Sequence, residues 1–384
     1  MGPFKNDVIL LMTDGEELGL LGAIAFMREH PWAKDVGLVL NFESRGNKGP
    51  SFMFETSEGN GWLVREFTKA APQPVAYSII YNFYKLMPND TDLTVFREGG
   101  LPGLNFAFGM GFDAYHTAID TPDNLDLSSL QHHGNYMLSL TKHFGQLELS
   151  EVRQEDRVYF NIVGWKLITY PESWVFWFMV LGALLFAITV WNGLRRRRIS
   201  LKGLAGGFLV TLLSLVIVFG IIAIVWEIVR ANVTGSYYQS IMKDFDVGKF
   251  YFIGLLLLML IIIWGFIRWC SRYVRAENLW IGSLLLWLLL CVATTLYLPG
   301  GSYLFIWPLL ISLIGLNVSY SMREGAWSWV SALFATPGIM LFSPIIYLVS
   351  IMMTLELAGP LMAVCALACT LIYPLFCRKP IARG

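Results

Sequence analysis

A series of apolar segments, beginning at Trp174, constrains this chain more than any other feature of its sequence. Each is roughly 18–25 residues long, the length that an α-helix needs to cross about 30 Å of hydrocarbon. The segments are residues 174–193, 204–226, 250–269, 279–298, 303–320, 328–351 and 358–376. Because 55% of the chain is hydrophobic and only 15% is charged, a wholly soluble or disordered protein is excluded. We predict an all-α polytopic membrane domain of about seven spans over residues 174–377.

Basic residues are unevenly divided between the two sides that seven spans would define. Twelve lie on one side: Arg195, Arg196, Arg197, Arg198, Lys202, Arg268, Arg272, Arg275, Arg323, Arg378, Lys379 and Arg383. Four lie on the other: Lys166, Arg230, Lys243 and Lys249. Loops rich in Lys and Arg face the cytoplasm. We therefore expect a cytoplasmic tail at residues 378–384 and an extracytoplasmic or lumenal N-terminal domain.

The formal net charge of zero hides an acidic first part and a basic second part. Residues 1–160 hold 12 Lys and Arg against 21 Asp and Glu, and the remainder holds 16 against 7. No nucleic-acid partner is expected, because the first part is acidic and the basic residues of the second lie between apolar segments. The cysteines are Cys270, Cys291, Cys365, Cys369 and Cys377. The acidic part therefore contains neither a disulfide nor a Cys-ligated zinc site.

Residues 1–150 alternate between predicted strands and predicted helices. Strands are expected at residues 7–13, 36–42, 51–55 and 104–108, and helices at 18–29, 61–71, 92–99 and 127–147. This alternation predicts an α/β domain with a mostly parallel sheet flanked by helices, followed by a linker over residues 151–173. Ligands of such sheets bind at the carboxyl ends of the strands, so functional residues are expected directly after the strands.

Acidic and histidine residues do follow the predicted strands. Glu16 and Glu17 come after the first strand, Glu43 follows the second, and His116 lies beyond the fourth. Zinc binds carboxylate oxygen and imidazole nitrogen, and a carboxylate next to it can act as a general base. Residue types and spacing alone leave two interpretations open: a zinc site, or surface carboxylates with an ordinary loop histidine.

Four segments resemble, in the same order, the aminopeptidase Y and bacterial leucyl aminopeptidase family of two-zinc exopeptidases. They are DVILLMTDGEELGLLGA, NFESRG, DTDLTVFREGGLPGLNFAF and YHTAIDTPDNLDLSSLQHHG. They are most similar to the membrane-bound branch of that family, of the vacuolar membrane protease and endoplasmic reticulum metallopeptidase type. The resemblance covers about residues 5–147 and implies a zinc exopeptidase-like fold.

The resemblance implies roles for five residues at the expected site. Glu16 would be the general base that takes a proton from water. Glu17 and His116 would bind one zinc ion, and Glu43 would bind a second. Tyr115 would donate a hydrogen bond to the oxyanion of the tetrahedral intermediate, the alternative being a packed ring whose hydroxyl faces solvent.

The resemblance also places two aspartates beside the site. Asp90 and Asp92 correspond to an acidic segment of the family and would position the site from just outside the zinc ligands. Without the resemblance, both residues would be interpreted as ordinary carboxylates at the start of a helix.

The chain departs from the family upstream of the Gly-Glu-Glu turn. Relatives carry a histidine in an HxD motif there, and an aspartate that bridges the two metal ions. Here no histidine precedes Gly15, and neither Asp7 nor Asp14 matches the bridging position. We therefore expect an N-terminally truncated domain: the intact site would hold two zinc ions, and this chain fewer or none, since zinc normally takes three or four protein ligands.

The sequence predicts a membrane-anchored zinc metallopeptidase of the aminopeptidase type, which hydrolyses the N-terminal peptide bonds of peptides. Peptide substrates and the lipid bilayer are its expected partners. The alternative is a catalytically silent, peptidase-like domain that binds or regulates on a membrane scaffold, because the upstream ligands are missing. A transporter whose outer domain only docks a partner is a third class.

Overall fold

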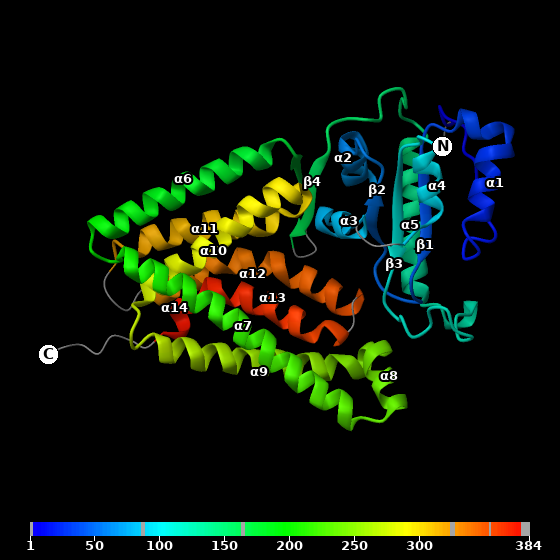
Figure 1. Ribbon diagram of the computed structural model, residues 1–384. Helices are drawn as coiled ribbons and strands as arrows, with labels where there is room; N and C mark the ends of the chain where they lie inside the picture. The colour runs from blue at the N-terminus through cyan, green and yellow to red at the C-terminus, as the bar shows by residue number, and fades with distance from the viewer. Residues whose placement is uncertain (1–2, 86–88, 163–165, 323–326, 353–354, 378–384) are drawn as a thin grey trace. The chain divides into compact units, whose positions relative to one another are not determined.

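The computed structural model describes residues 3–85, 89–162, 166–322, 327–352 and 355–377. The chain divides into two compact units, and all strands of the described residues lie in the first (Figure 1). One unit comprises Met1–Trp174 with the short segment Leu298–Gly301. The other comprises Val175–Tyr297 and Ser302–Gly384. The predicted class, an α/β region followed by a helical region, is confirmed.

Three strands form a small mixed sheet in the N-terminal unit. They are β1 (Val39–Ser44), β2 (Phe52–Thr56) and β3 (Gly103–Phe108). The central strand β3 is parallel to β1 and antiparallel to β2, so the sheet is less parallel than we expected. Parallel strands need a connection of about a dozen residues or more. Residues 45–51, between β1 and β2, are too few for such a connection, so β2 runs in the opposite direction.

One face of this sheet is apolar, and α2 (Gly61–Ala70) and α5 (Leu127–Phe144) cover it. The core on this face consists mainly of Met53, Leu104 and Phe106 from the strands and Leu63, Val64, Phe67, Tyr136, Leu140 and Phe144 from the helices. Successive side chains of a strand point to opposite faces. Leu104 and Phe106 therefore enter this core, and Asn105 between them points to the other face.

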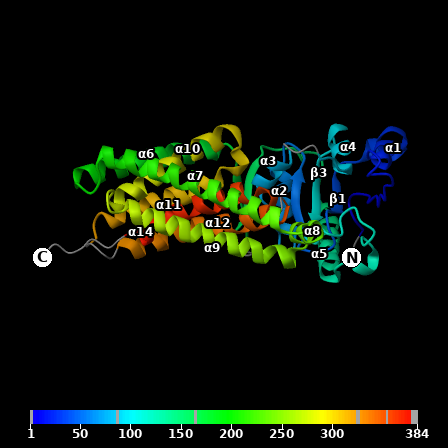
Figure 2. The ribbon, with the colours of Figure 1, turned by 60° about the horizontal axis from the view of Figure 1, so that its bottom comes forward.

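The other face of the sheet is contacted by α4 (Asp92–Glu98), and α1 (Leu21–Glu29) packs against α4. Both views show α1 and α4 next to each other (Figure 1 and Figure 2). Their apolar contacts form a second, smaller core of Ala23, Phe26, Ala33, Leu93 and Phe96. The strands present polar side chains to this side of the sheet, which is where the candidate site lies.

The strand predicted at residues 7–13 is wrong. Among the described residues no strand includes this segment, and its apolar side chains are exposed, Leu10 by 79% and Met12 by 92%. The segment is fixed at its two ends, where Asn6 donates to the Phe144 and Leu147 carbonyls and Thr13 to Asp92. A strand requires hydrogen bonds to a neighbouring strand, and β1 makes its ladder with β3 alone.

The expected linker at residues 151–173 contains a β-hairpin formed by β4 (Arg157–Ile162) and β5 (Lys166–Pro171). Tyr159 and Leu167 of the hairpin join the core beneath α2 and α5. Asn161 accepts a 2.8 Å hydrogen bond from the Ala76 backbone, close to α3 (Ser78–Tyr84). The hairpin is thus part of the N-terminal unit.

Every predicted membrane span corresponds to helical structure in the second unit. The long helices are α6 (Trp174–Arg195), α7 (Leu201–Asn232), α9 (Phe245–Cys270), α10 (Ala276–Tyr297), α11 (Tyr303–Ser319) and α12 (Trp327–Met352), followed by α13 (Ala358–Cys369) and α14 (Tyr373–Phe376). A short helix, α8 (Gly235–Lys243), lies between α7 and α9. By length and hydropathy, six spans among the described residues can cross a membrane, and α11 is apolar but shorter.

Three turns that carry basic residues meet at one end of this helical unit. The Arg275 guanidinium, before α10, donates to the carbonyl of Arg197, between α6 and α7. Arg196 donates to Ser321 Oγ after α11. Because α10 starts and α11 ends at this end of the unit, α11 runs in the direction opposite to α10, although it is shorter than the other long helices. Arg323 and the basic tail at residues 378–384 lie outside the described residues.

Two glycines allow α7 and α10 to approach closely. A Cβ atom added at Gly282 would lie 2.3 Å from the Phe208 backbone nitrogen, and one at Gly207 would lie 2.0 Å from the Asn278 carbonyl oxygen. Small residues allow such backbone contact between helices in a membrane, where packing rather than water drives association.

Gly282→Ala should therefore destabilise the helical unit, because the added methyl group has no room against α7. We expect a loss of about 1–3 kcal/mol, typical of overpacking, seen as a lower thermal unfolding midpoint of the full chain in detergent. Gly220→Ala on α7 is the matched control, since no atom lies within 4 Å of its added Cβ. Equal midpoints for the two variants would contradict this account of the contact.

Candidate active site

A tight turn places two adjacent glutamates before α1. Gly15 has φ +69°, a conformation that glycine adopts without strain. The Gly15 carbonyl accepts hydrogen bonds from the backbone amides of Leu18 and Leu21, which closes the turn. As a result, Glu16 is half-buried and Glu17 is exposed. The two neighbouring carboxylates therefore face different surroundings.

Glu17 contacts His116, although the two residues are 99 positions apart in the sequence. The distance from Glu17 Oε1 to His116 Nε2 is 2.7 Å. His116 has φ +56°, a backbone conformation uncommon outside glycine that tends to occur at functional sites. The Tyr115 ring stacks on the His116 ring with centroids 3.8 Å apart, and the Arg45 guanidinium lies 5.8 Å from the Tyr115 ring centroid.

Asp92 joins this turn to α4. Its Oδ2 atom accepts a 2.5 Å hydrogen bond from the hydroxyl of Thr13, three residues before Glu16. Asp92 is buried, and within the described part of the chain its Oδ1 atom has no hydrogen-bond partner. Asp90, in contrast, is exposed. Of the two predicted positioning aspartates, Asp92 is therefore the one that contacts the glutamate turn.

Glu43 lies near the end of β1 and is close enough to the other carboxylates to feel their charges. Burial, and then the charges of Glu16, Glu55 and Asp92, raise the pKa of Glu43 to about 8, which the Asn105 side chain partly opposes. Burial also raises the pKa of Glu16, as do the charges of Glu17 and Asp92, against an opposing effect of His116. The acidic side chains thus form one electrostatically linked group.

The hydroxyl of Tyr115 remains protonated at neutral pH. Burial raises the pKa of Tyr115, the charge of Glu17 adds to this effect, and Arg45 acts against it. A protonated phenol can donate a hydrogen bond to a developing negative charge. The position of Tyr115 against His116 places this donor beside the Glu17–His116 pair.

Glu17 and His116 suit zinc by their chemistry, since both are common zinc ligands and their donor atoms converge. The described residues contain no group of three His, Cys, Asp or Glu side chains that could together hold a metal ion. The residues present thus provide two donors of a zinc shell, and among the described residues Glu43 does not join them in a group of three.

Sequence reasoning missed four polar residues around this site: Thr13, Arg45, Glu55 and Asn105. Thr13 and Arg45 are within the segments that carry the resemblance, but nothing in their type indicates a contact with Asp92 or Tyr115. For Asn105 a signal was available, because it is a polar residue inside an otherwise apolar strand, whereas Glu55 stands beside Thr56 at the end of β2. Polar residues at such positions require a buried partner.

Comparison with known proteins identifies the class of the N-terminal unit. Residues 1–141 match the model of Peptidase family M28. The chain therefore carries an M28 peptidase domain, followed by helices with the length and hydropathy of membrane spans. No solved structure matches the chain significantly.

Two similar curated proteins are named as a metallopeptidase and a membrane protease. The mouse "Endoplasmic reticulum metallopeptidase 1" is 32% identical over 177 residues, 44% of this chain and 20% of that protein. The "Vacuolar membrane protease" of Candida dubliniensis is 32% identical over 196 residues, 48% of this chain and 21% of that protein. The chain thus spans about a fifth of the length of these relatives. The predicted resemblance to both types is confirmed.

The raised pKa of Glu43 predicts a pH-dependent stability. A carboxyl group with a folded pKa of about 8, against an ordinary 4.5, holds its proton more tightly when folded. The stability it contributes is complete below about pH 4.5 and is lost as the pH rises through 8. In metal-free protein, the thermal unfolding midpoint should therefore fall between pH 5 and pH 9.

Glu43→Gln should flatten this pH dependence, because the amide does not titrate. Glu98→Gln is the matched control, an exposed glutamate on α4, and should follow the wild-type curve. A slope as steep in Glu43→Gln as in the wild type would show that another group is responsible.

Proposed function

We propose that this chain belongs to a membrane-anchored metallopeptidase, and that Glu16, Glu17, Glu43, Tyr115 and His116 form its active site. The observation that carries the proposal is the 2.7 Å contact of Glu17 with His116 beside the half-buried Glu16. The match to Peptidase family M28 over the same residues supports it. So do the printed names of the similar proteins, a metallopeptidase and a membrane protease.

Two side chains perform the proton and charge chemistry of peptide hydrolysis in this proposal. Glu16 accepts a proton from the attacking water and passes it to the leaving amine. Its raised pKa suits this task, because a general base works best with a pKa closer to the operating pH. Tyr115 donates a hydrogen bond to the oxygen that becomes negative in the tetrahedral intermediate.

Glu17 and His116 are proposed to hold a zinc ion, and Glu43 to contribute to a second. A bound zinc ion would supply a Lewis acid that polarises the scissile carbonyl group. A zinc ion would bind the neutral imidazole of His116 and the carboxylate of Glu17, so it would compete with protons for these two side chains.

The proposed substrates are peptides, cleaved at the N-terminal peptide bond. This aminopeptidase specificity rests on the resemblance to the two-zinc exopeptidases. The proposed orientation places the peptidase domain outside the cytoplasm or in a lumen, because the turns with most basic residues meet at one end of the helical unit.

A second candidate function is a metal-free peptidase-like module that binds peptides without cleaving them. One observation favours it: the described residues offer no set of three metal ligands. Zinc content and turnover of the same purified protein separate the two functions. Zinc with turnover supports the peptidase, and peptide binding with neither supports the module.

Glu16→Gln tests the proposed general base. The amide cannot accept a proton, so kcat for aminoacyl-nitroanilide hydrolysis should fall by about 10²–10⁴-fold, while zinc content stays at the wild-type level. Glu29→Gln, an exposed glutamate at the end of α1, is the control and should retain full turnover. Unchanged kcat in Glu16→Gln would refute the role of Glu16.

His116→Ala tests the metal ligands separately from catalysis. Loss of one of two contacting donors should weaken zinc binding by more than about a hundredfold, since changes just outside a metal shell already cost 10–100-fold. The measurement is chelator competition with zinc on the full chain in detergent. His30→Ala removes another exposed histidine and should leave the affinity unchanged. A His116→Ala protein with the full zinc complement would contradict the assignment.

A further inference from the structure

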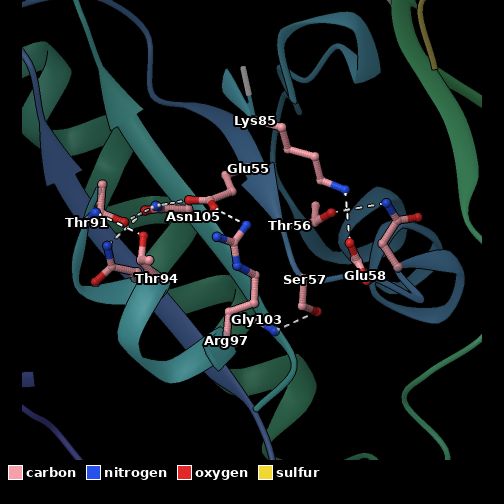
Figure 3. Close-up of polar contacts among 12 residues, drawn as sticks. Glu55, Thr56, Ser57, Glu58, Lys85, Thr91, Thr94, Arg97, Gly103 and Asn105 are labelled. Carbon is pink, nitrogen blue, oxygen red and sulfur yellow. Dashed lines mark hydrogen bonds and ion pairs between the residues drawn. The ribbon is translucent and has the colours of Figure 1, made fainter. Parts of the chain in front are cut away.

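A row of three polar side chains crosses the sheet on the side that faces α4, and Figure 3 shows two of them, Asn105 and Glu55. Asn41, Asn105 and Glu55 lie side by side on β1, β3 and β2. Asn41 Nδ2 donates to Asn105 Oδ1 at 2.9 Å, and Asn105 Nδ2 donates to Glu55 Oε2 at 2.9 Å. The row therefore connects all three strands through side chains as well as through the backbone.

Glu55 is the charged end of this row. It is completely buried, and Arg97 of α4 donates to its Oε1 atom at 3.0 Å. A buried carboxylate costs several kcal/mol of desolvation, which only good partners offset. An apolar side chain at this position would avoid that cost. The presence of Glu55 therefore indicates a role that an apolar residue could not fill. The hydrogen-bond partners of Glu55 indicate what this role is.

Asn105 has no spare hydrogen atom on its amide nitrogen. One N–H binds Glu55, and the other donates to Thr91 Oγ1 at 2.9 Å. Thr91 directly precedes α4, and its backbone amide donates to Thr94 Oγ1. Glu55 thus fixes the orientation of the Asn105 amide, and Asn105 in turn fixes the start of α4 (Figure 3).

Two residues of the candidate active site are next to the ends of this network. Asp92, which binds the glutamate turn through Thr13, directly follows Thr91. Glu43 lies two residues after Asn41 on β1, so both side chains point to the same face of the sheet. Any change in the row is therefore transmitted to Asp92 and Glu43 through adjacent residues.

We propose that Glu55 is a positioning residue of the active site: held by Arg97, it orients Asn105, which fixes the start of α4 and the strand that carries Glu43. This inference rests on the proposed function, because it concerns the same site. Glu55 touches no reacting atom, and its effect is to keep Asp92 and Glu43 in fixed places.

A reciprocal exchange tests the network. In Glu55→Gln, the new amide N–H points toward either the Asn105 N–H or the Arg97 guanidinium. In both orientations two hydrogen-bond donors face each other. In Asn105→Asp, two carboxylates face each other. In the double variant, the new glutamine donates to the new aspartate and still accepts from Arg97. The aspartate has no N–H for Thr91, but the Thr91 hydroxyl can turn and donate to it, so each contact of the row can form again with these donors and acceptors exchanged. The double variant should therefore recover what each single variant loses.

Glu66→Gln is the matched control. Glu66 is also a buried carboxylate of the N-terminal unit, bound by Lys69 at 2.7 Å and His143 at 2.8 Å, but it lies on α2 across the sheet. Its substitution should lower stability without changing catalysis. This control separates a positioning effect from a general loss of stability.

The first measurement is the steady-state kinetics of the full chain in detergent, at a temperature where every variant is folded. Glu55→Gln and Asn105→Asp should each lower kcat at least about tenfold with KM within about twofold, since small displacements at a catalytic site are costly. The double variant should return to within about threefold of wild type, and Glu66→Gln should match wild type. Equal kcat in Glu55→Gln and Glu66→Gln, or no recovery in the double variant, would overturn the proposal.

The second measurement is amide hydrogen exchange of the metal-free protein, which does not require activity. Exchange at residues 39–44 and 92–98 should accelerate in Glu55→Gln, return toward wild type in the double variant, and stay unchanged in Glu66→Gln. If the wild-type chain neither binds zinc nor cleaves peptides, the proposed function fails and this result alone decides the positioning role. Unchanged exchange in Glu55→Gln would reject it.

Discussion

The alternation of side chains along the central strand β3 determines how the N-terminal unit is organised. Leu104 and Phe106 enter the apolar core under α2 and α5, and Asn105 between them points to α4. A shift of one residue would bury Asn105 among aromatic rings and expose Phe106 to the polar row. The alternation that places Leu104 and Phe106 in the core therefore also places Asn41, Asn105 and Glu55 on the face of the sheet to which Glu43 points.

Elements with strong local signals could be predicted from the sequence, and those that depend on distant partners could not. The apolar segments predicted the membrane helices, because length and hydropathy alone define a span. The segment at residues 7–13 has the composition of a buried strand, but composition does not supply the neighbouring strand that a ladder requires. The hairpin at β4 and β5 was missed because its partners, such as Tyr159 with the α2 core, are far away in sequence.

The candidate site could be predicted from short motifs and not from strand positions alone. The Tyr-His pair follows β3, but the Gly-Glu-Glu turn follows residues 7–13, which form no strand, and both were singled out because they lie in segments that resemble a known family. The 2.7 Å contact of Glu17 with His116 joins them. The contacts that support these residues could not be predicted from the sequence. The bond from Thr13 to Asp92 joins residues 79 positions apart and depends on how the glutamate turn sits against α4.

The grouping of carboxylates carries an electrostatic cost that the rest of the unit has to accommodate. Burial and mutual repulsion raise the pKa values of Glu16 and Glu43, so the metal-free site holds protons that isolated carboxylates would release. Arg97 offsets the charge of Glu55. A cation bound among these groups would lower the same pKa values and release those protons. Affinity for a cation, protonation and the stability of this face of the sheet are therefore coupled properties of one set of side chains.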